Sequence, residues 1–150
     1  MEIERKFIPK RLPDNLESYP HTMLEQGYLS TNPVVRVRKD GDSYYLTYKG
    51  SGMMTREEYN LPLTKESYLH LLAKADGIII SKCRYRIPLY DGLTAELDIF
   101  QGSLDGLLMV EVEFSDEDSA SSFTPPEWFG EDVTFDSRYH NSSMSKGIRP

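Results

Sequence analysis

The chain has 150 residues, 27% of them charged, and a formal net charge of −7 at pH 7. This length predicts a single domain with a sizeable core, and the acidic balance argues against a nucleic-acid partner. No apolar run reaches the ~18 residues of a membrane span, and the single cysteine, Cys83, excludes an internal disulfide and a multi-thiolate metal site. We therefore expect a cytoplasmic protein whose metal, if it binds one, has oxygen ligands.

Segments that alternate apolar and polar residues dominate the chain and predict strands. In chain order, the expected strands lie near residues 1–8, 25–29, 34–40, 43–49, 55–61, 78–87, 93–100 and 107–115. Asp40-Gly41-Asp42 and Asp91-Gly92 are typical of hairpin turns. Helices are expected at residues 64–76, 116–123 and 141–146, the first stopped by Gly77. The class is α+β, one domain over residues 1–150, dominated by an antiparallel sheet.

Charged side chains occupy alternate positions in most of these strands. Glu2, Glu4 and Lys6 share one face of the first strand, because successive side chains of a strand point to opposite sides. The later rows are Arg36 with Arg38, Thr47 with Lys49, Arg56 with Glu58 and Asn60, Lys82 with Arg84 and Arg86, Glu96 with Asp98, and Glu111 with Glu113. The opposite faces of the last three of these strands are apolar.

One such strand alone is best explained by a sheet that faces water on one side. The repetition of rows, several of a single sign, favours a barrel whose lumen collects seven carboxylates and eight cationic groups. Burying these groups unpaired would cost several kcal/mol per ion, so the lumen requires a ligand. Lys and Arg suit phosphoryl oxygens, and carboxylates suit Mg²⁺ or Mn²⁺ bridging to phosphate.

Taken in order, these motifs resemble the CYTH proteins, also called triphosphate tunnel metalloenzymes. The resemblance covers nearly the whole chain. It rests on E-x-E-x-K at Glu2, R-x-R at Arg36, T-x-K at Thr47, K-x-R-Y at Lys82, E-x-D-x-F at Glu96, E-x-E at Glu111, and the tail from Val133 to Tyr139 with Asn141. It implies an eight-stranded antiparallel β-barrel forming a tunnel, with a few helices packed outside. It also implies a small triphosphate substrate, Mg²⁺ or Mn²⁺, and a possible homodimer, with no nucleic acid or membrane partner.

The resemblance also implies roles for the charged residues. The expected metal ligands are Glu2, Glu4, Glu58, Glu96, Asp98, Glu111 and Glu113. The expected triphosphate-binding residues are Lys6, Arg36, Arg38, Lys49, Arg56, Lys82, Arg84 and Arg86. Asn60 departs from the family pattern, because relatives often carry a second carboxylate there.

Lys82 and Glu4 are the expected catalytic residues. Crowding by Arg84 and Arg86 would lower the pKa of Lys82, so that it could orient or deprotonate a water. No serine, cysteine or histidine constellation indicates a covalent intermediate, and His140 is expected to be structural.

The expected reaction is metal-dependent hydrolysis of inorganic triphosphate to pyrophosphate and phosphate, with nucleoside triphosphates as further substrates. Four alternatives stay open at this stage. They are a class IV-type adenylyl cyclase, a thiamine-triphosphatase, a non-catalytic module that binds polyphosphate or nucleotide, and a β-sandwich with solvated charged faces.

Overall fold

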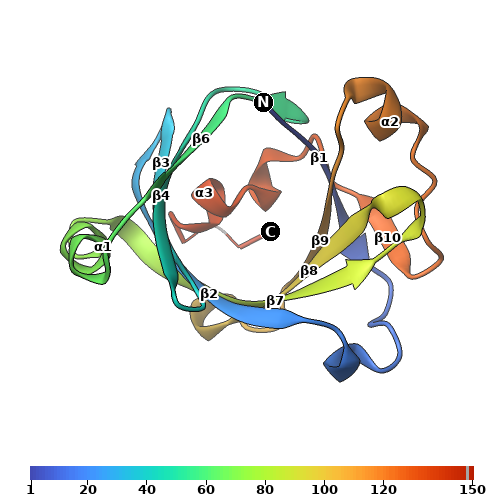
Figure 1. The fold of residues 1–150 in the computed structure, drawn as a ribbon, viewed down its shortest axis with the longest axis horizontal. Coiled ribbons are helices and arrows are strands. Elements are labelled where there is room, and N and C mark those ends of the chain that lie inside the picture. Colours follow the sequence, from blue (N-terminus) through green and yellow to red (C-terminus); the bar gives the residue numbers. More distant parts are fainter. Residues whose placement is uncertain (148) are drawn as a thin grey trace.

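The computed structural model describes residues 1–147 and 149–150. Its antiparallel sheet curls into a nearly closed barrel (Figure 1), with the strand order β10-β1-β9-β8-β7-β2-β3-β4-β6. We call the interior of this barrel the tunnel. The strands are β1 (Glu2–Pro9), β2 (His21–Thr31), β3 (Val34–Asp40), β4 (Ser43–Lys49), β5 (Thr55–Arg56), β6 (Glu58–Pro62), β7 (Asp76–Pro88), β8 (Thr94–Gln101), β9 (Leu108–Glu113) and β10 (Phe129–Asp132). The α-helices are α1 (Lys65–Leu72), α2 (Glu117–Ser122) and α3 (Asn141–Met144), and the 3₁₀ turns are Leu16–Ser18, Tyr90–Gly92, Gly102–Leu104 and Ser137–Tyr139.

A divided segment closes the barrel. The sequence predicts one strand over residues 55–61, but the structure splits it at Glu57 into β5 and β6. β6 pairs with β4, where Glu58 lies opposite Lys49, and β5 pairs with β1, where Arg56 lies opposite Glu2. All eight expected strands are thus present, and together they form the antiparallel barrel. The short β10, which the sequence analysis did not predict, adds to the other half of β1.

The helices differ more from expectation than the strands do. α1 and α2 lie outside the barrel as predicted, whereas α3 lies within the outline of the tunnel (Figure 1). α1 ends at Leu72 instead of residue 76, and Gly77 belongs to β7. Gly77 has φ +70°, and a Cβ there would lie 2.0 Å from the carbonyl oxygen of Ser145. The glycine is therefore required by the close approach of the α3 segment, not by a helix end.

Two apolar clusters explain why α3 sits in the tunnel. The first lies beneath α2 and includes Phe7, Leu97 and Val110. The second includes Ile80, Phe100, Met109 and, from α3, Met144. Ile80, Phe100 and Met109 are each two positions from a charged residue of the inner face, so they point into the barrel. The inner face is therefore apolar at one end, and α3 packs on it; we call this the α3 end of the tunnel, opposite the open end.

Within the part of the chain that the structure describes, no helix is both long and apolar enough to cross a membrane.

Candidate active site

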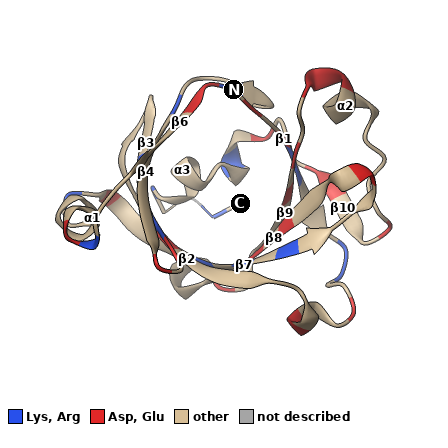
Figure 2. Cartoon of the chain, viewed as in Figure 1, with Lys and Arg blue, Asp and Glu red and all other residues tan. Residues whose placement is uncertain are grey.

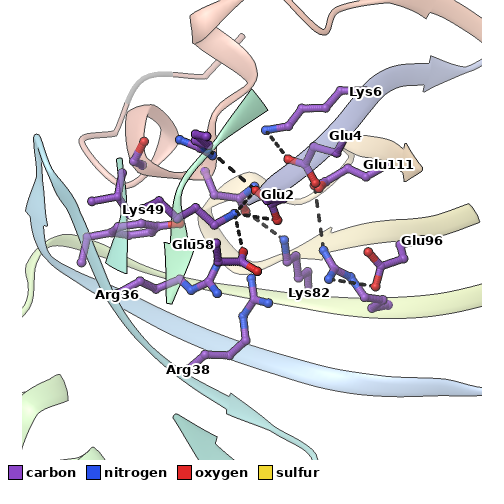
Figure 3. A pocket seen from close by; sticks show the side chains of 16 residues that line it. Glu2, Glu4, Lys6, Arg36, Arg38, Lys49, Glu58, Lys82, Glu96 and Glu111 are labelled. Carbon is purple, nitrogen blue, oxygen red and sulfur yellow. Dashed lines mark hydrogen bonds and ion pairs between the residues drawn. The ribbon is translucent and has the colours of Figure 1, made fainter. Parts of the chain in front are cut away.

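Charged residues recur along the strands of the barrel (Figure 2). Their side chains meet in one pocket in the tunnel (Figure 3). It contains about 60 Å³ of open space. Among the residues predicted from the sequence, it is lined by the carboxylates Glu2, Glu4, Glu58, Glu96 and Glu111 and by the cations Lys6, Arg36, Arg38, Lys49, Arg56, Lys82 and Arg84. The space is small because these long side chains extend toward one another across the tunnel.

Cations and carboxylates of the pocket pair with each other. The Lys49 Nζ lies 2.9 Å from Glu2 Oε1 and 3.4 Å from Glu58 Oε2. The Arg56 Nε lies 3.8 Å from the same Glu2 oxygen, and the Lys6 Nζ lies 3.8 Å from Glu4 Oε1. These pairs offset the cost of burying so many charges, and they leave both sets of side chains free to exchange partners with a ligand.

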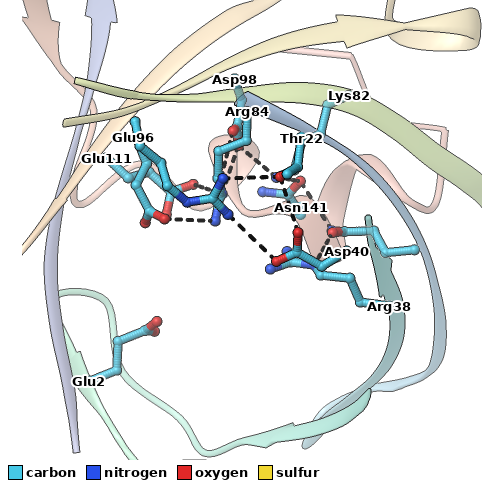
Figure 4. A network of polar contacts seen from close by, with 12 residues as sticks. Glu2, Thr22, Arg38, Asp40, Lys82, Arg84, Glu96, Asp98, Glu111 and Asn141 are labelled. Carbon is cyan, nitrogen blue, oxygen red and sulfur yellow. Dashed lines mark hydrogen bonds and ion pairs between the residues drawn. The ribbon is translucent and has the colours of Figure 1, made fainter. Parts of the chain in front are cut away.

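Lys82 belongs to a second network of polar contacts, drawn in Figure 4. Its side chain is fully buried, and its Nζ lies 2.7 Å from Asp98 Oδ2 and donates to Asn141 Oδ1 at 3.0 Å. Burial lowers the pKa of Lys82 to about 7, because Asp98 opposes the shift only in part and the charges of Arg84 and Arg38 add to it. The predicted depression is confirmed, although burial and Arg38 cause it where the sequence analysis invoked Arg86.

Asp98 holds two cations in place. Arg84 donates through Nε to Asp98 Oδ1 at 2.8 Å and through Nη2 to Asp98 Oδ2 at 2.9 Å. The carboxylate is 0% exposed and does not line the pocket. The sequence predicts Asp98 as a metal ligand, whereas the structure places it behind Lys82 and Arg84, with both oxygens occupied. Its surroundings suit the orientation of these two cations.

Burial and neighbouring charges shift the pKa values of several other carboxylates. Burial raises the pKa of Glu4 well above its usual range, and the neighbouring Glu111 raises it further. Burial also raises the pKa of Glu2 and Glu113, each of which has another carboxylate nearby. For Glu111, Lys6 and Arg84 outweigh burial and lower the pKa well below its usual range. Glu2, Glu4 and Glu113 therefore carry a negative charge only at a cost that a cation would relieve.

These carboxylates fit a hard divalent ion by their chemistry, since Mg²⁺ and Mn²⁺ prefer oxygen ligands. Among residues 1–147 and 149–150, however, no three His, Cys, Asp or Glu side chains are already grouped as a metal site. The reason is visible in the ion pairs, where Glu2 and Glu4 are turned toward Lys49 and Lys6. A metal would therefore have to compete with the lysines for these oxygens.

Arg86 and Glu113 lie apart from the tunnel pocket. Arg86 pairs with Asp40 at 3.5 Å and donates to the Thr22 hydroxyl at 3.0 Å. Arg86 and Glu113, together with Glu96, line a separate cavity of about 520 Å³. Glu113 also lines a cavity of about 550 Å³ at the open end, beside Tyr44 and Tyr45. The structure thus does not bring Arg86 into the group of triphosphate-binding residues predicted with it.

Sequence reasoning missed a neutral part of the site. Gln26 is 0% exposed; its Oε1 accepts from Arg38 Nε at 2.8 Å, and its Nε2 donates to Asn141 Oδ1 at 3.4 Å and to the Tyr28 hydroxyl at 3.2 Å. Asn141 and Ser142, at the start of α3, line the pocket with Tyr28. Asn141 stands in the tail that carries the family resemblance, but a lone Gln in a strand gives no comparable signal.

The comparisons with known proteins agree with one another. A CYTH domain profile matches residues 1–149. An inorganic triphosphatase of Nitrosomonas europaea is 42% identical, over 98% of this chain and 98% of that protein. One of Acetivibrio thermocellus is 37% identical, over 97% of this chain and 93% of that protein. A crystal structure of an inorganic triphosphatase superposes with a TM-score of 0.73 at 38% identity, covering 100% of this chain and 97% of the other.

Proposed function

The chain belongs to the CYTH domain family, and from this membership we propose that it hydrolyses inorganic triphosphate with the help of a bound divalent metal ion. The observation that carries the proposal is the tunnel pocket, in which buried Lys and Arg side chains face buried carboxylates. The relatives at 42% and 37% identity, named inorganic triphosphatases, support the same activity.

The two sets of charges would separate when substrate and metal bind. Lys6, Lys49, Arg36 and Arg38 would then bind phosphoryl oxygens, since their present partners are carboxylates, hydroxyl groups and, for Arg38, also the Gln26 amide oxygen. The carboxylates left behind, Glu2, Glu4, Glu58, Glu96, Glu111 and Glu113, would hold Mg²⁺ or Mn²⁺. A bound divalent ion would neutralise phosphoryl charge and favour loss of a proton from water.

Lys82 is the residue best placed to take that proton. With a pKa of about 7, a substantial fraction of its amine is neutral near neutral pH. The oxygen of water would bond to a terminal phosphorus while the bridging P–O bond breaks. One proton of the water would leave with phosphate and the other, relayed by Lys82, with pyrophosphate. Phosphoryl transfer of this kind depends mainly on positioning and charge stabilisation, which the arginines that line the pocket would supply.

The experiment that tests the proposal is phosphate release from tripolyphosphate and from ATP, with Mg²⁺, with Mn²⁺ and with neither. We expect metal-dependent release that Glu4→Gln lowers by ~100-fold or more, as for other groups acting on transition-state charge. Glu66→Gln, at an exposed position on α1, is the matched control and should keep full activity.

Two results would count against the hydrolase. Release that needs no metal, or that persists in Glu4→Gln, would remove the carboxylates from the mechanism. An absence of release from both substrates would favour the cyclase, which is checked by cyclic AMP formation from ATP, and after it a module that binds without turnover.

A specific feature favours ATP as a further substrate. The cavity of about 550 Å³ at the open end adjoins the tunnel pocket, because both are lined by Glu2, Arg36 and Arg38. Tyr44, Tyr45 and Leu61 add apolar surface to its wall, where an organic group attached to a triphosphate could lie. The ratio of tripolyphosphate to ATP turnover in the same assay measures this contribution.

We also propose a cytoplasmic location, on the ground that Cys83 is the single cysteine. The homodimer stays a prediction, which the mass in solution would test.

A further inference from the structure

A row of polar side chains crosses the inner face of the sheet from β3 to β6. Arg36 of β3 lies opposite Thr47 of β4, and Thr47 lies opposite Asn60 of β6. Arg36 Nη2 donates to the Thr47 hydroxyl at 2.9 Å, and this hydroxyl donates to Asn60 Oδ1 at 2.6 Å. Asn60 Nδ2 in turn donates to Glu58 Oε1 at 3.3 Å. We call these four side chains the Thr47 network; its two ends, Arg36 and Glu58, both line the tunnel pocket (Figure 3).

The donors available fix the direction of each hydrogen bond in the Thr47 network. A guanidinium has donors only, so Arg36 donates and the Thr47 oxygen accepts. Thr47 has one hydroxyl proton, which it gives to Asn60 Oδ1. The amide oxygen of Asn60 therefore points to Thr47 and its NH₂ group to Glu58. Asn supplies both an acceptor and a donor here, whereas Asp, which has the same shape, would supply acceptors only when ionised.

Arg36 depends on this network for its orientation. In the part of the chain that the structure describes, Arg36 forms no ion pair, and Thr47 is its one side-chain hydrogen-bond partner. The 2.6 Å contact from Thr47 to Asn60 is at the short end of the range for a hydroxyl donor, as expected for a hydroxyl that an adjacent cation polarises. By accepting this proton, Asn60 keeps the lone pairs of the Thr47 oxygen turned toward the guanidinium.

Glu58 is held at both of its oxygens. Oε1 accepts from Asn60, and Oε2 lies 3.4 Å from the Lys49 Nζ. The bond from Asn60 does not involve Lys49, so it would persist when Lys49 exchanges Glu58 for a phosphoryl oxygen. Because the amide donates to one oxygen only, it leaves the other oxygen of Glu58 open to a metal ion.

We propose that Asn60 is a positioning residue that orients Arg36, through Thr47, toward phosphate and holds Glu58 directly toward the metal ion. The inference rests on the proposed function for the ligands of Arg36 and Glu58. Asn60 acts through these neighbours and not by contact with the phosphate. Its neutral amide serves both ends at once, which neither a carboxylate nor an apolar side chain can do.

Two binding measurements without turnover test the two ends. Calorimetric titration of pyrophosphate into the metal-free protein reports the Arg36 end, and the electron paramagnetic resonance signal of free Mn²⁺ reports the Glu58 end. Asn60→Leu should weaken pyrophosphate binding ~2–10-fold, as expected for a neutral hydrogen bond, and should also weaken Mn²⁺ binding. Tyr59→Phe is the matched control and should bind both ligands as the wild type does, because Tyr59 is 60% exposed on the outer face of β6.

Thr47→Val separates the two ends. Arg36 loses its acceptor at nearly constant volume, so pyrophosphate binding should weaken ~10-fold or more. Mn²⁺ binding should not change, because Asn60 still donates to Glu58. Adding Asn60→Leu to Thr47→Val should weaken pyrophosphate binding no further, since Asn60 acts on Arg36 through Thr47. Thr47→Ser keeps the hydroxyl and should bind pyrophosphate as the wild type does. Additive losses in the double variant would overturn the orienting of Arg36.

Asn60→Asp tests the Glu58 end by the sign of its effect. It places a second carboxylate beside Glu58, so Mn²⁺ binding should tighten, whereas Asn60→Leu weakens it. A general loss of structure would weaken Mn²⁺ binding in both variants. Mn²⁺ affinity that is unchanged in both would overturn the holding of Glu58.

These assays also separate the inference from the proposed function. Hydrolysis of tripolyphosphate together with wild-type affinities in Asn60→Leu would keep the proposed function and overturn the positioning role. The expected changes in affinity in a protein without turnover would keep the positioning role and reject the hydrolase. A wild-type protein that binds neither pyrophosphate nor Mn²⁺ would overturn both.

Discussion

The pKa of Lys82 is set by residues from four separate segments. Asp98 on β8, Arg84 on β7, Arg38 on β3 and Asn141 on α3 surround its amine. Asp98 raises the pKa of Lys82 while burial and the two arginines lower it, and the result is about 7. The proton-accepting form of Lys82 is therefore set by a balance that single substitutions can move in either direction.

The pH dependence of kcat/KM, which reports the free enzyme, follows from this balance. If neutral Lys82 accepts the proton, activity should rise with pH through about 7 and level off above it. Lys82→Arg cannot lose its proton, so it should lose the rising limb together with ~10²–10⁴-fold of the rate. The measurement is tripolyphosphate hydrolysis across the neutral range at fixed metal concentration.

Asp98→Asn is the control for this assay. Removing the carboxylate removes the contribution that raises the pKa of Lys82, so the rising limb should move to lower pH. Protonation of the substrate is the same for both proteins and cannot produce such a difference. A limb that stays in place in Asp98→Asn would show that another group titrates.

Gln26 links Arg38, which we propose binds phosphate, to Asn141 and so to Lys82. Gln26→Leu would keep the volume but leave Arg38 Nε without its acceptor. A hydrogen bond to a charged group is worth ~1.5–3 kcal/mol, so kcat/KM should fall ~10–100-fold. Gln26→Glu restores an acceptor for Arg38, so its KM should return part of the way to the wild-type value. The hydrogen bond from residue 26 to Asn141 would not be restored. Wild-type kinetics in Gln26→Leu would show that the link is only structural.

At the scale of elements, the strands are predictable from the sequence because charged side chains that share one face of a strand must stand at alternate positions. Rows such as Lys82, Arg84 and Arg86 can share a face only at period two, so the strand over residues 78–87 was placed within two residues of β7. It could not predict where α3 lies, because Asn141–Met144 is short and its one apolar anchor, Met144, packs on strands far away in the chain. The role of Gln26 was invisible for the same reason, since its partner Asn141 is 115 positions distant.

Gly77 offers a test of how α3 is held. A Cβ at this position would lie 2.0 Å from the Ser145 carbonyl oxygen, so Gly77→Ala must displace α3. We expect the free energy of unfolding and the turnover of tripolyphosphate both to fall, since Asn141 would withdraw from Lys82. Gly92→Ala is a matched control, because its φ of +72° imposes similar backbone strain while no atom lies within 4 Å of the new Cβ.

The two glycine variants can be compared by Tm and kcat. Both should lose the ~1–2 kcal/mol of a left-handed alanine, or ~2–8 °C at ~2–4 °C per kcal/mol for a domain of this size. Gly77→Ala alone should lose more stability and also activity. Equal losses in the two variants would mean that the contact with Ser145 does not constrain α3.

At the scale of the whole molecule, the barrel brings together two sets of opposite charge that pair with each other. The sequence predicted both sets, because their members alternate along strands. It could not predict their pairing, such as Lys49 with Glu2 or Arg84 with Asp98, which depends on barrel closure. Nor could it predict that Glu96 and Glu113 line the open end while Arg56 and His140 line a cavity of about 170 Å³ at the α3 end of the tunnel.

This pairing of lysines with carboxylates predicts that a metal ion and an anion stabilise the fold cooperatively. Pyrophosphate alone would draw Lys49 from Glu2 and leave a buried carboxylate unpaired, and Mg²⁺ alone would leave the lysine unpaired. Together they satisfy both, so the shift in Tm with both should exceed the sum of the separate shifts; such coupling is typically ~1–3 kcal/mol, or ~2–12 °C here. In Glu4→Gln the metal has lost a ligand, so the excess should shrink while the shift with pyrophosphate alone persists. Additive shifts in the wild type, measured by thermal unfolding at constant ionic strength, would contradict a shared metal and phosphate site.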